Sequence, residues 1–112
     1  MAEGISTLYK AGRASRIDYT NASEYVTLKP GTQAVDIYAT SACWVQFGSP
    51  GGTAVAAIPS AEKTWVEKLH FLGVGGSGRF AVDQSTDGAL VRIAVIQETA
   101  NGSLYVTELV DG

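Results

Sequence analysis

A glycine-rich segment in the second half of the chain has the spacing of a phosphate-binding loop. Residues Gly73–Gly78 read Gly-Val-Gly-Gly-Ser-Gly, which matches the pattern G-x-G-x-x-G. Such a loop holds a pyrophosphate only where a helix begins inside it, because the helix N-terminus supplies the amide groups. The residues that follow, Arg79–Val82, are typical of a strand. We therefore interpret the glycine-rich segment as a connection between strands.

Histidine and cysteine are too few for most catalytic and metal sites. His70 is the only histidine and Cys43 the only cysteine. A Ser or Cys hydrolase needs a histidine beside its nucleophile, and neither residue sits in a recognisable nucleophile context. Asp83 and Asp87 resemble part of a calcium loop, but the closing glutamate is missing. The sequence therefore predicts a protein that is not an enzyme and has no metal or other cofactor.

The aromatic residues suggest binding instead. On the alternating segment that contains Cys43 and Val45, Trp44 points to the opposite face. If Cys43 and Val45 face the core, Trp44 is exposed or lies at an interface; if the register is reversed, Trp44 is core. Tryptophan and tyrosine are enriched in protein interfaces. The predicted binding residues on the sheet faces are Tyr38, Trp44 and Trp65.

Composition and charge limit the partners. The 112 residues carry a formal net charge of −3, and the 8 lysines and arginines are scattered, so nucleic acid is not expected as a partner. No apolar stretch approaches the ~18 residues that would span a bilayer, so no membrane partner is expected either. The N-terminus lacks the features of a signal peptide, which predicts synthesis in a cytoplasm.

Period-two alternation defines the elements that must position these residues. Apolar and polar side chains alternate from Arg16 onward, as in half-buried strands. This pattern predicts an all-β fold, an antiparallel β-sandwich of about eight strands that resembles a jelly roll. The predicted strands cover residues 16–19, 24–28, 35–40, 43–47, 53–58, 64–72, 79–82 and 90–97, with a last strand around Leu104–Val106.

Two segments carry turn or helix signals in addition to the alternation. Asn101-Gly102 lies between alternating segments, and this dipeptide favours the type I′ turn of a β-hairpin. The segment 60–72 is ambiguous, because Ser60 and Gly73 fit the two ends of a helix while Thr64, Trp65 and Val66 prefer strands. We favour a strand from about Thr64 to Leu72.

The first residues differ from the rest of the chain. Residues 1–14 show no period and are mildly basic, so we expect an extended N-terminal arm, followed by a single β-sandwich domain over residues 15–112. The arm has too few apolar side chains to form a core, which suggests that it attaches to a neighbouring subunit. Its candidate partner-binding residues are the apolar Ile5, Leu8 and Tyr9 and the basic Lys10, Arg13 and Arg16.

The order of these segments resembles the small decoration, or cement, proteins of tailed-bacteriophage capsids and related short virion proteins. The resemblance covers roughly residues 16–110 and is one of pattern. The segments that carry it are the Gly/Ser-rich start, Val35–Thr40, Cys43–Gly48, the Ala/Pro loop, Phe80–Val82, Leu90–Ile96 and Gly102–Leu109.

This resemblance implies a jelly-roll sandwich that forms a homo-oligomer, a dimer or a trimer, and binds the major capsid protein on the virion surface. The alternative is a ligand-binding or carbohydrate-binding module of a phage tail or head fibre, with Trp44 and Trp65 as stacking platforms. The environment of the tryptophan side chains distinguishes the two: a protein interface favours the first function and an open face favours the second.

Overall fold

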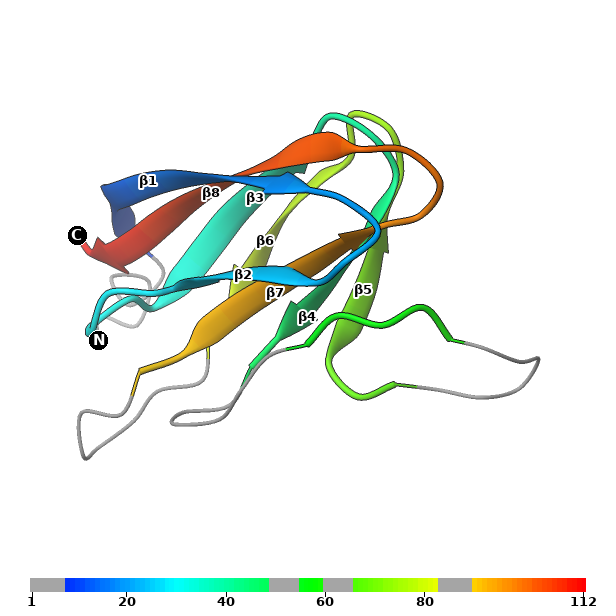
Figure 1. The fold of residues 1–112 in the computed structure, drawn as a ribbon. Helices are drawn as coiled ribbons and strands as arrows, with labels where there is room; N and C mark the ends of the chain where they lie inside the picture. The colour runs from blue at the N-terminus through cyan, green and yellow to red at the C-terminus, as the bar shows by residue number, and fades with distance from the viewer. Residues whose placement is uncertain (1–7, 49–54, 60–65, 83–89) are drawn as a thin grey trace.

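A computed structural model of the protein describes residues 8–48, 55–59, 66–82 and 90–112. These residues form eight strands, arranged in two antiparallel four-stranded sheets, and no helix. The two sheets lie face to face (Figure 1). The all-β sandwich predicted from the alternation is therefore confirmed.

The strands of each sheet come from distant parts of the chain. The first sheet has the order β1 (Tyr9–Tyr19), β8 (Gly102–Asp111), β3 (Ala34–Ala39) and β6 (Ser77–Ala81). The second sheet has the order β2 (Glu24–Thr27), β7 (Arg92–Gln97), β4 (Cys43–Phe47) and β5 (Leu69–Leu72). Thus β1 pairs with β8, β2 with β7, β3 with β6 and β4 with β5, the nested pairing of a jelly roll.

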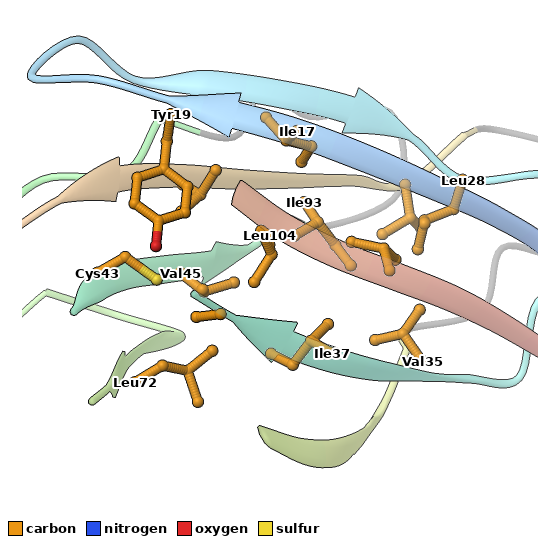
Figure 2. Packing of buried hydrophobic residues seen from close by; sticks show 14 residues of the cluster. Ile17, Tyr19, Leu28, Val35, Ile37, Cys43, Val45, Leu72, Ile93 and Leu104 are labelled. Atoms are coloured by element: carbon orange, nitrogen blue, oxygen red, sulfur yellow. The ribbon is translucent and has the colours of Figure 1, made fainter. Parts of the chain in front are cut away.

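The core lies between the sheets, as the alternation requires. On β3, Val35 and Ile37 are buried, while Tyr38 is exposed on the outer face. Apolar side chains from both sheets meet in one buried cluster (Figure 2). Its fully buried members include Val35, Val45, Ile93, Val95, Leu104 and Val106.

A buried tyrosine forms hydrogen bonds at one end of this core. Tyr19 is 1% exposed, and its hydroxyl donates to the carbonyl oxygen of Ser41 at 2.6 Å while it accepts from the Ser41 amide at 3.1 Å. Figure 2 shows its ring directed from β1 toward Cys43 on β4. A buried tyrosine is stable only when its hydroxyl has a partner, so Ser41 makes this contact between the sheets possible.

The prediction of an N-terminal arm is wrong for the second half of that segment. Residues 9–14 are not an arm outside the domain but the first half of β1, in which Lys10 pairs with Val110 and Ala11 with Leu109. The register shifts between Ala11 and Ala14, so β1 carries a β-bulge. A bulge interrupts period-two alternation, which is why the sequence pattern concealed this strand. Residues 1–7 lie outside the described residues.

The bulge lies beside a buried carboxylate on β8. Glu108 is 1% exposed, and its Oε2 accepts from Arg13 Nε at 2.8 Å. Its Oε1 accepts from the Lys29 amide at 2.8 Å, with the Thr32 hydroxyl 2.9 Å away. Arg13 also donates through Nη2 to the Thr27 carbonyl oxygen at 2.9 Å. This network joins the first sheet to the connection between β2 and β3, and it satisfies a charge that would otherwise be costly to bury.

The predicted Asn101-Gly102 hairpin is wrong. The preceding strand, β7, belongs to the second sheet and β8 to the first, so the chain crosses between the sheets here. Neither Asn101 nor Gly102 has the positive φ that a type I′ turn requires. Instead Gly102 packs closely: a Cβ atom there would collide with Ser41 Oγ and lie 2.6 Å from Tyr19 Oη.

Two further predictions are corrected in part. Residues 55–58 do not form a strand: the Val55 and Ala56 amides donate to side chains, at 2.8 Å to Gln46 Oε1 and 2.9 Å to Ser23 Oγ. Within the described part of segment 60–72, only Leu69–Leu72 is a strand, since a turn with positive φ at Lys68 precedes it. Residues 60–65, Trp65 among them, lie outside the described residues.

Removal of the buried carboxylate tests the Glu108 network. We expect Glu108→Ala to lower the free energy of unfolding by about 3 kcal/mol or more, because Arg13 and the Lys29 amide lose their acceptor. Glu108→Gln should cost less, since it keeps one acceptor oxygen. The exposed Asp111→Ala on the same strand is the control and should change stability by less than about 0.5 kcal/mol. Urea denaturation followed by circular dichroism measures all three, and an unchanged Glu108→Ala variant would contradict the role of the network.

A methyl group at position 102 tests the close packing there. Gly102→Ala should destabilise the domain by about 1–3 kcal/mol, because the new Cβ would overlap Ser41 and the buried Tyr19 hydroxyl. Gly73→Ala is the matched control, since a Cβ there meets nothing within 4 Å. Equal melting temperatures for the two variants would show that position 102 has room.

Candidate functional site

Of the residues weighed for catalysis or metal binding, the structure describes Cys43 and His70, while Asp83 and Asp87 lie outside the described residues. Cys43 is fully buried, and burial raises the pKa of its thiol to about 11, although a hydrogen bond with Tyr19 acts in the opposite direction. The thiol is therefore protonated at neutral pH, and a thiol is a poor nucleophile compared with a thiolate. On β5, His70 pairs with Val45, and its ring packs 4.9 Å from that of Phe80.

The glycine-rich segment is a turn between β5 and β6. Gly75 has a φ of 69°, and the Gly76 amide donates to the Gly73 carbonyl oxygen at 2.8 Å. No helix begins there, so the interpretation as a connection between strands is confirmed. Among the described residues, no group of three or more His, Cys, Asp or Glu side chains lies together in a way that could hold a metal ion.

Two tyrosines dominate the outer face of the first sheet. Tyr38 on β3 and Tyr105 on β8 are directly paired across the strands. Their side chains are 46% and 45% exposed, and their ring centroids lie 6.3 Å apart at an interplanar angle of 41°. The rings therefore form two adjoining, tilted apolar surfaces on this face.

A bidentate ion pair lies beside the tyrosines. Arg79 on β6 donates to both oxygens of Asp36 on β3, with Nε–Oδ1 at 2.7 Å and Nη2–Oδ2 at 3.0 Å. These hydrogen bonds hold the pKa of the Asp36 carboxyl below its ordinary value of 3.8. The Tyr9 ring also lies on this face, with its centroid 5.8 Å from the Arg79 guanidinium carbon. Ionised and oriented, Asp36 is available as a hydrogen-bond acceptor at neutral pH.

These side chains surround an open hollow of about 330 Å³. The residues that line it include Asp36, Tyr38, Ser77, Tyr105 and Thr107. Nearby on β1 and β8, Arg16 pairs with Asp18 at 3.1 Å, and Ser103 Oγ donates to the same carboxylate at 2.7 Å. The face thus combines aromatic surface with charges that are already paired.

The outer face of the second sheet is more apolar. Trp44 lies on it, opposite the buried Cys43 and Val45, so the predicted orientation of Trp44 is confirmed. Its indole N–H donates to Glu98 Oε1 at 2.7 Å, and its ring centroid lies 5.0 Å from that of Phe71 on β5. Both contacts fix the half-buried indole in one orientation.

Further side chains extend this apolar face. The Arg92 guanidinium carbon lies 4.5 Å from the centroid of the Tyr25 ring, so the two side chains are stacked. Segment 55–59 lies across the same face, where Ala56 is buried against Ala94 and Ile96. The exposed apolar residues on this face and on the segment across it are Tyr25 at 52%, Val55 at 60%, Ile58 at 42% and Phe71 at 43%.

The residues predicted for the arm do not form one surface. Tyr9 and Arg16 lie on the outer face of the first sheet, together with Tyr38. Arg13 instead holds Glu108, and its role is structural. Lys10 lines an open cleft, and the exposed Leu8 lies beside the C-terminal Gly112. Ile5 lies outside the described residues, as does Trp65, which was predicted for a sheet face.

Some residues of the two faces were missed from the sequence. Tyr105 alternates with the buried Leu104 and Val106, so the rule that selected Tyr38 could have found it. Tyr25 and Arg92 form a stack between strands that no local pattern reveals.

Comparisons with models of known protein families, with curated proteins and with solved structures find no match to this chain. The structural class is therefore set by the strand order alone, a jelly-roll β-sandwich. In the part of the chain that the structure describes, no helix has the length and apolar character to cross a membrane.

The protonation of Cys43 can be tested by alkylation. We expect iodoacetamide at neutral pH to modify Cys43 about 100-fold more slowly in the folded protein than in denaturing urea, because a pKa raised from 9.0 to about 11 lowers the thiolate fraction by that factor. The folded state holds the Cys43 proton more tightly than the unfolded state does. The contribution of this proton to the free energy of unfolding is therefore complete below pH 9.0 and is lost as the pH rises toward about 11. Equal alkylation rates in the two states would contradict the burial of the thiol.

Proposed function

We propose that this protein is a non-enzymatic virion structural protein that binds the outer surface of a tailed-phage capsid and stabilises it. Made in the host cytoplasm, it attaches to the major capsid protein through the outer face of its second sheet. The resemblance of the sequence to capsid decoration proteins supports the choice of partner. The fold is compatible with it, since jelly rolls occur in viral capsid domains and in lectins, but a fold alone does not define a function.

One observation carries the choice of docking face. Trp44, Tyr25 and Arg92 lie on the outer face of the second sheet, each held by a neighbour in the same domain. Tryptophan, tyrosine and arginine are the residue types that contribute most to protein–protein binding energy. Side chains that are already ordered lose little conformational entropy on binding. This face is therefore suited to a protein partner.

Binding of this kind would stabilise a capsid by mass action. A ligand that binds only the assembled shell favours assembly over dissociation, by an amount that grows with its concentration relative to Kd. Self-association into a dimer or trimer would place several docking faces in one oligomer and raise the avidity of its attachment to the shell.

Co-sedimentation with empty capsid shells tests this function. The shells are assembled from the major capsid protein encoded in the same genome as this chain. We expect the wild-type protein to sediment with them and the double variant Tyr25→Ala/Phe71→Ala to bind about tenfold more weakly or worse, because both rings are exposed on the docking face.

The matched control for this experiment is Tyr105→Ala, which removes a similarly exposed ring from the opposite face. It should bind as the wild type does. Thermal melts establish that all variants are folded. Failure of the wild-type protein to bind shells would refute the function, and weaker binding by the Tyr105 variant alone would refute the docking face.

A further inference from the structure

The hollow on the outer face of the first sheet has the composition of a sugar site. We infer that it binds a neutral oligosaccharide, with Tyr38 and Tyr105 stacked against sugar rings and Asp36, Ser77 and Thr107 hydrogen-bonded to sugar hydroxyls. The site lies on the side of the sandwich opposite the proposed docking face. It therefore goes beyond the proposed function, and a copy docked by the second sheet would leave it accessible.

The two rings supply the apolar part of the site. A pyranose ring presents C–H groups on its faces, and these pack on the faces of aromatic rings. Tyr38 and Tyr105 are fixed side by side by the pairing of β3 with β8, yet nearly half of each side chain is exposed. Because the planes of the two rings are inclined at 41°, the rings can contact two faces of one ligand. Amphipathic tyrosine rings suit a ligand with both apolar and hydroxylated surfaces.

The polar groups of the hollow supply the hydrogen bonds. Both oxygens of Asp36 accept from Arg79, which fixes the carboxylate, and each oxygen can still accept a further hydrogen bond. Ser77 and Thr107 add hydroxyls, which both donate and accept, and their side chains make no hydrogen bond with other described residues. A few polar groups of fixed orientation beside aromatic surface are typical of small-molecule sites.

Charge and size select the class of ligand. The charges near the hollow are paired, Asp36 with Arg79 and Asp18 with Arg16, so they provide no net attraction for a phosphate or a basic peptide. A wholly apolar ligand would remove water from the Asp36–Arg79 pair and from the hydroxyls of Ser77 and Thr107 without replacing its hydrogen bonds, which is costly. The volume of about 330 Å³ is at the lower end of the usual range for ligand sites, ~300–1,000 Å³, and suits one or two sugar rings.

Titration of the isolated full-length protein tests the site without any capsid, so its result is independent of the proposed function. The probes are maltotriose, cellotriose, chitotriose, mannotriose and lactose, and binding is followed by shifts in the amide NMR spectrum. We expect at least one of them to bind and to shift the amides of Tyr38, Tyr105 and Thr107. Tyr38→Ala and Tyr105→Ala should each weaken that binding about tenfold, whereas Tyr38→Phe, which keeps the ring, should have little effect.

Tyr25→Ala on the opposite face is the matched control and should bind the sugar as the wild type does. Three results would overturn the inference: no binding by any of the five neutral sugars, binding that the Tyr38 and Tyr105 substitutions leave unchanged, or binding of only an anionic probe such as sialyllactose. Thermal melts of the alanine variants separate loss of the site from loss of the fold.

Discussion

Burial of the Glu108 carboxylate is the constraint around which one end of this sandwich is organised. A charge enclosed between two sheets is tolerated only when nearly every hydrogen-bonding position is filled. Here Arg13 from β1 and the backbone of Lys29 fill them, and the same arginine also reaches the Thr27 carbonyl at the end of β2. One carboxylate thus holds together strands that are 95 residues apart in the chain. Arg13 itself lies within the bulge of β1, between Ala11 and Ala14.

In this arrangement, the contacts that join the two sheets do not use the outer faces of the sandwich. The polar contacts that join the sheets lie at the two ends of the core, at Glu108 and at Tyr19, while the centre is held by apolar packing. Neither Tyr38 nor Trp44 contributes to that buried cluster. Both side chains lie outside the core, which is the position expected of residues at a recognition surface.

The sequence predicts this structure well where alternation is regular and poorly where it is interrupted. Period two identified β3 and β4 and placed Trp44 on the face opposite Cys43 and Val45. It left open which of the two faces is buried, because alternation alone does not decide this. It identified residues 16–19 of β1 but missed residues 9–15, where a bulge shifts the register. It failed at Asn101-Gly102 because a turn dipeptide carries no information on which sheet the next strand joins. Glu108 follows Leu104 and Val106 at core-facing spacing, so its burial could be suspected, but its partner Arg13 could not.

The two faces differ in a way that bears on what each can bind. On the second sheet, the stacked Tyr25 and Arg92 and the fixed Trp44 offer apolar surface that a protein can cover and dehydrate. On the first sheet, Tyr38 and Tyr105 lie among paired charges, and covering these charges with an apolar partner would leave polar groups without water. A ligand with hydrogen-bonding groups of its own, such as the hydroxyls of a sugar, can replace that water. A jelly roll with strands nested in this order presents two separate outer faces, so the proposed attachment through one face and the proposed sugar binding through the other would not compete.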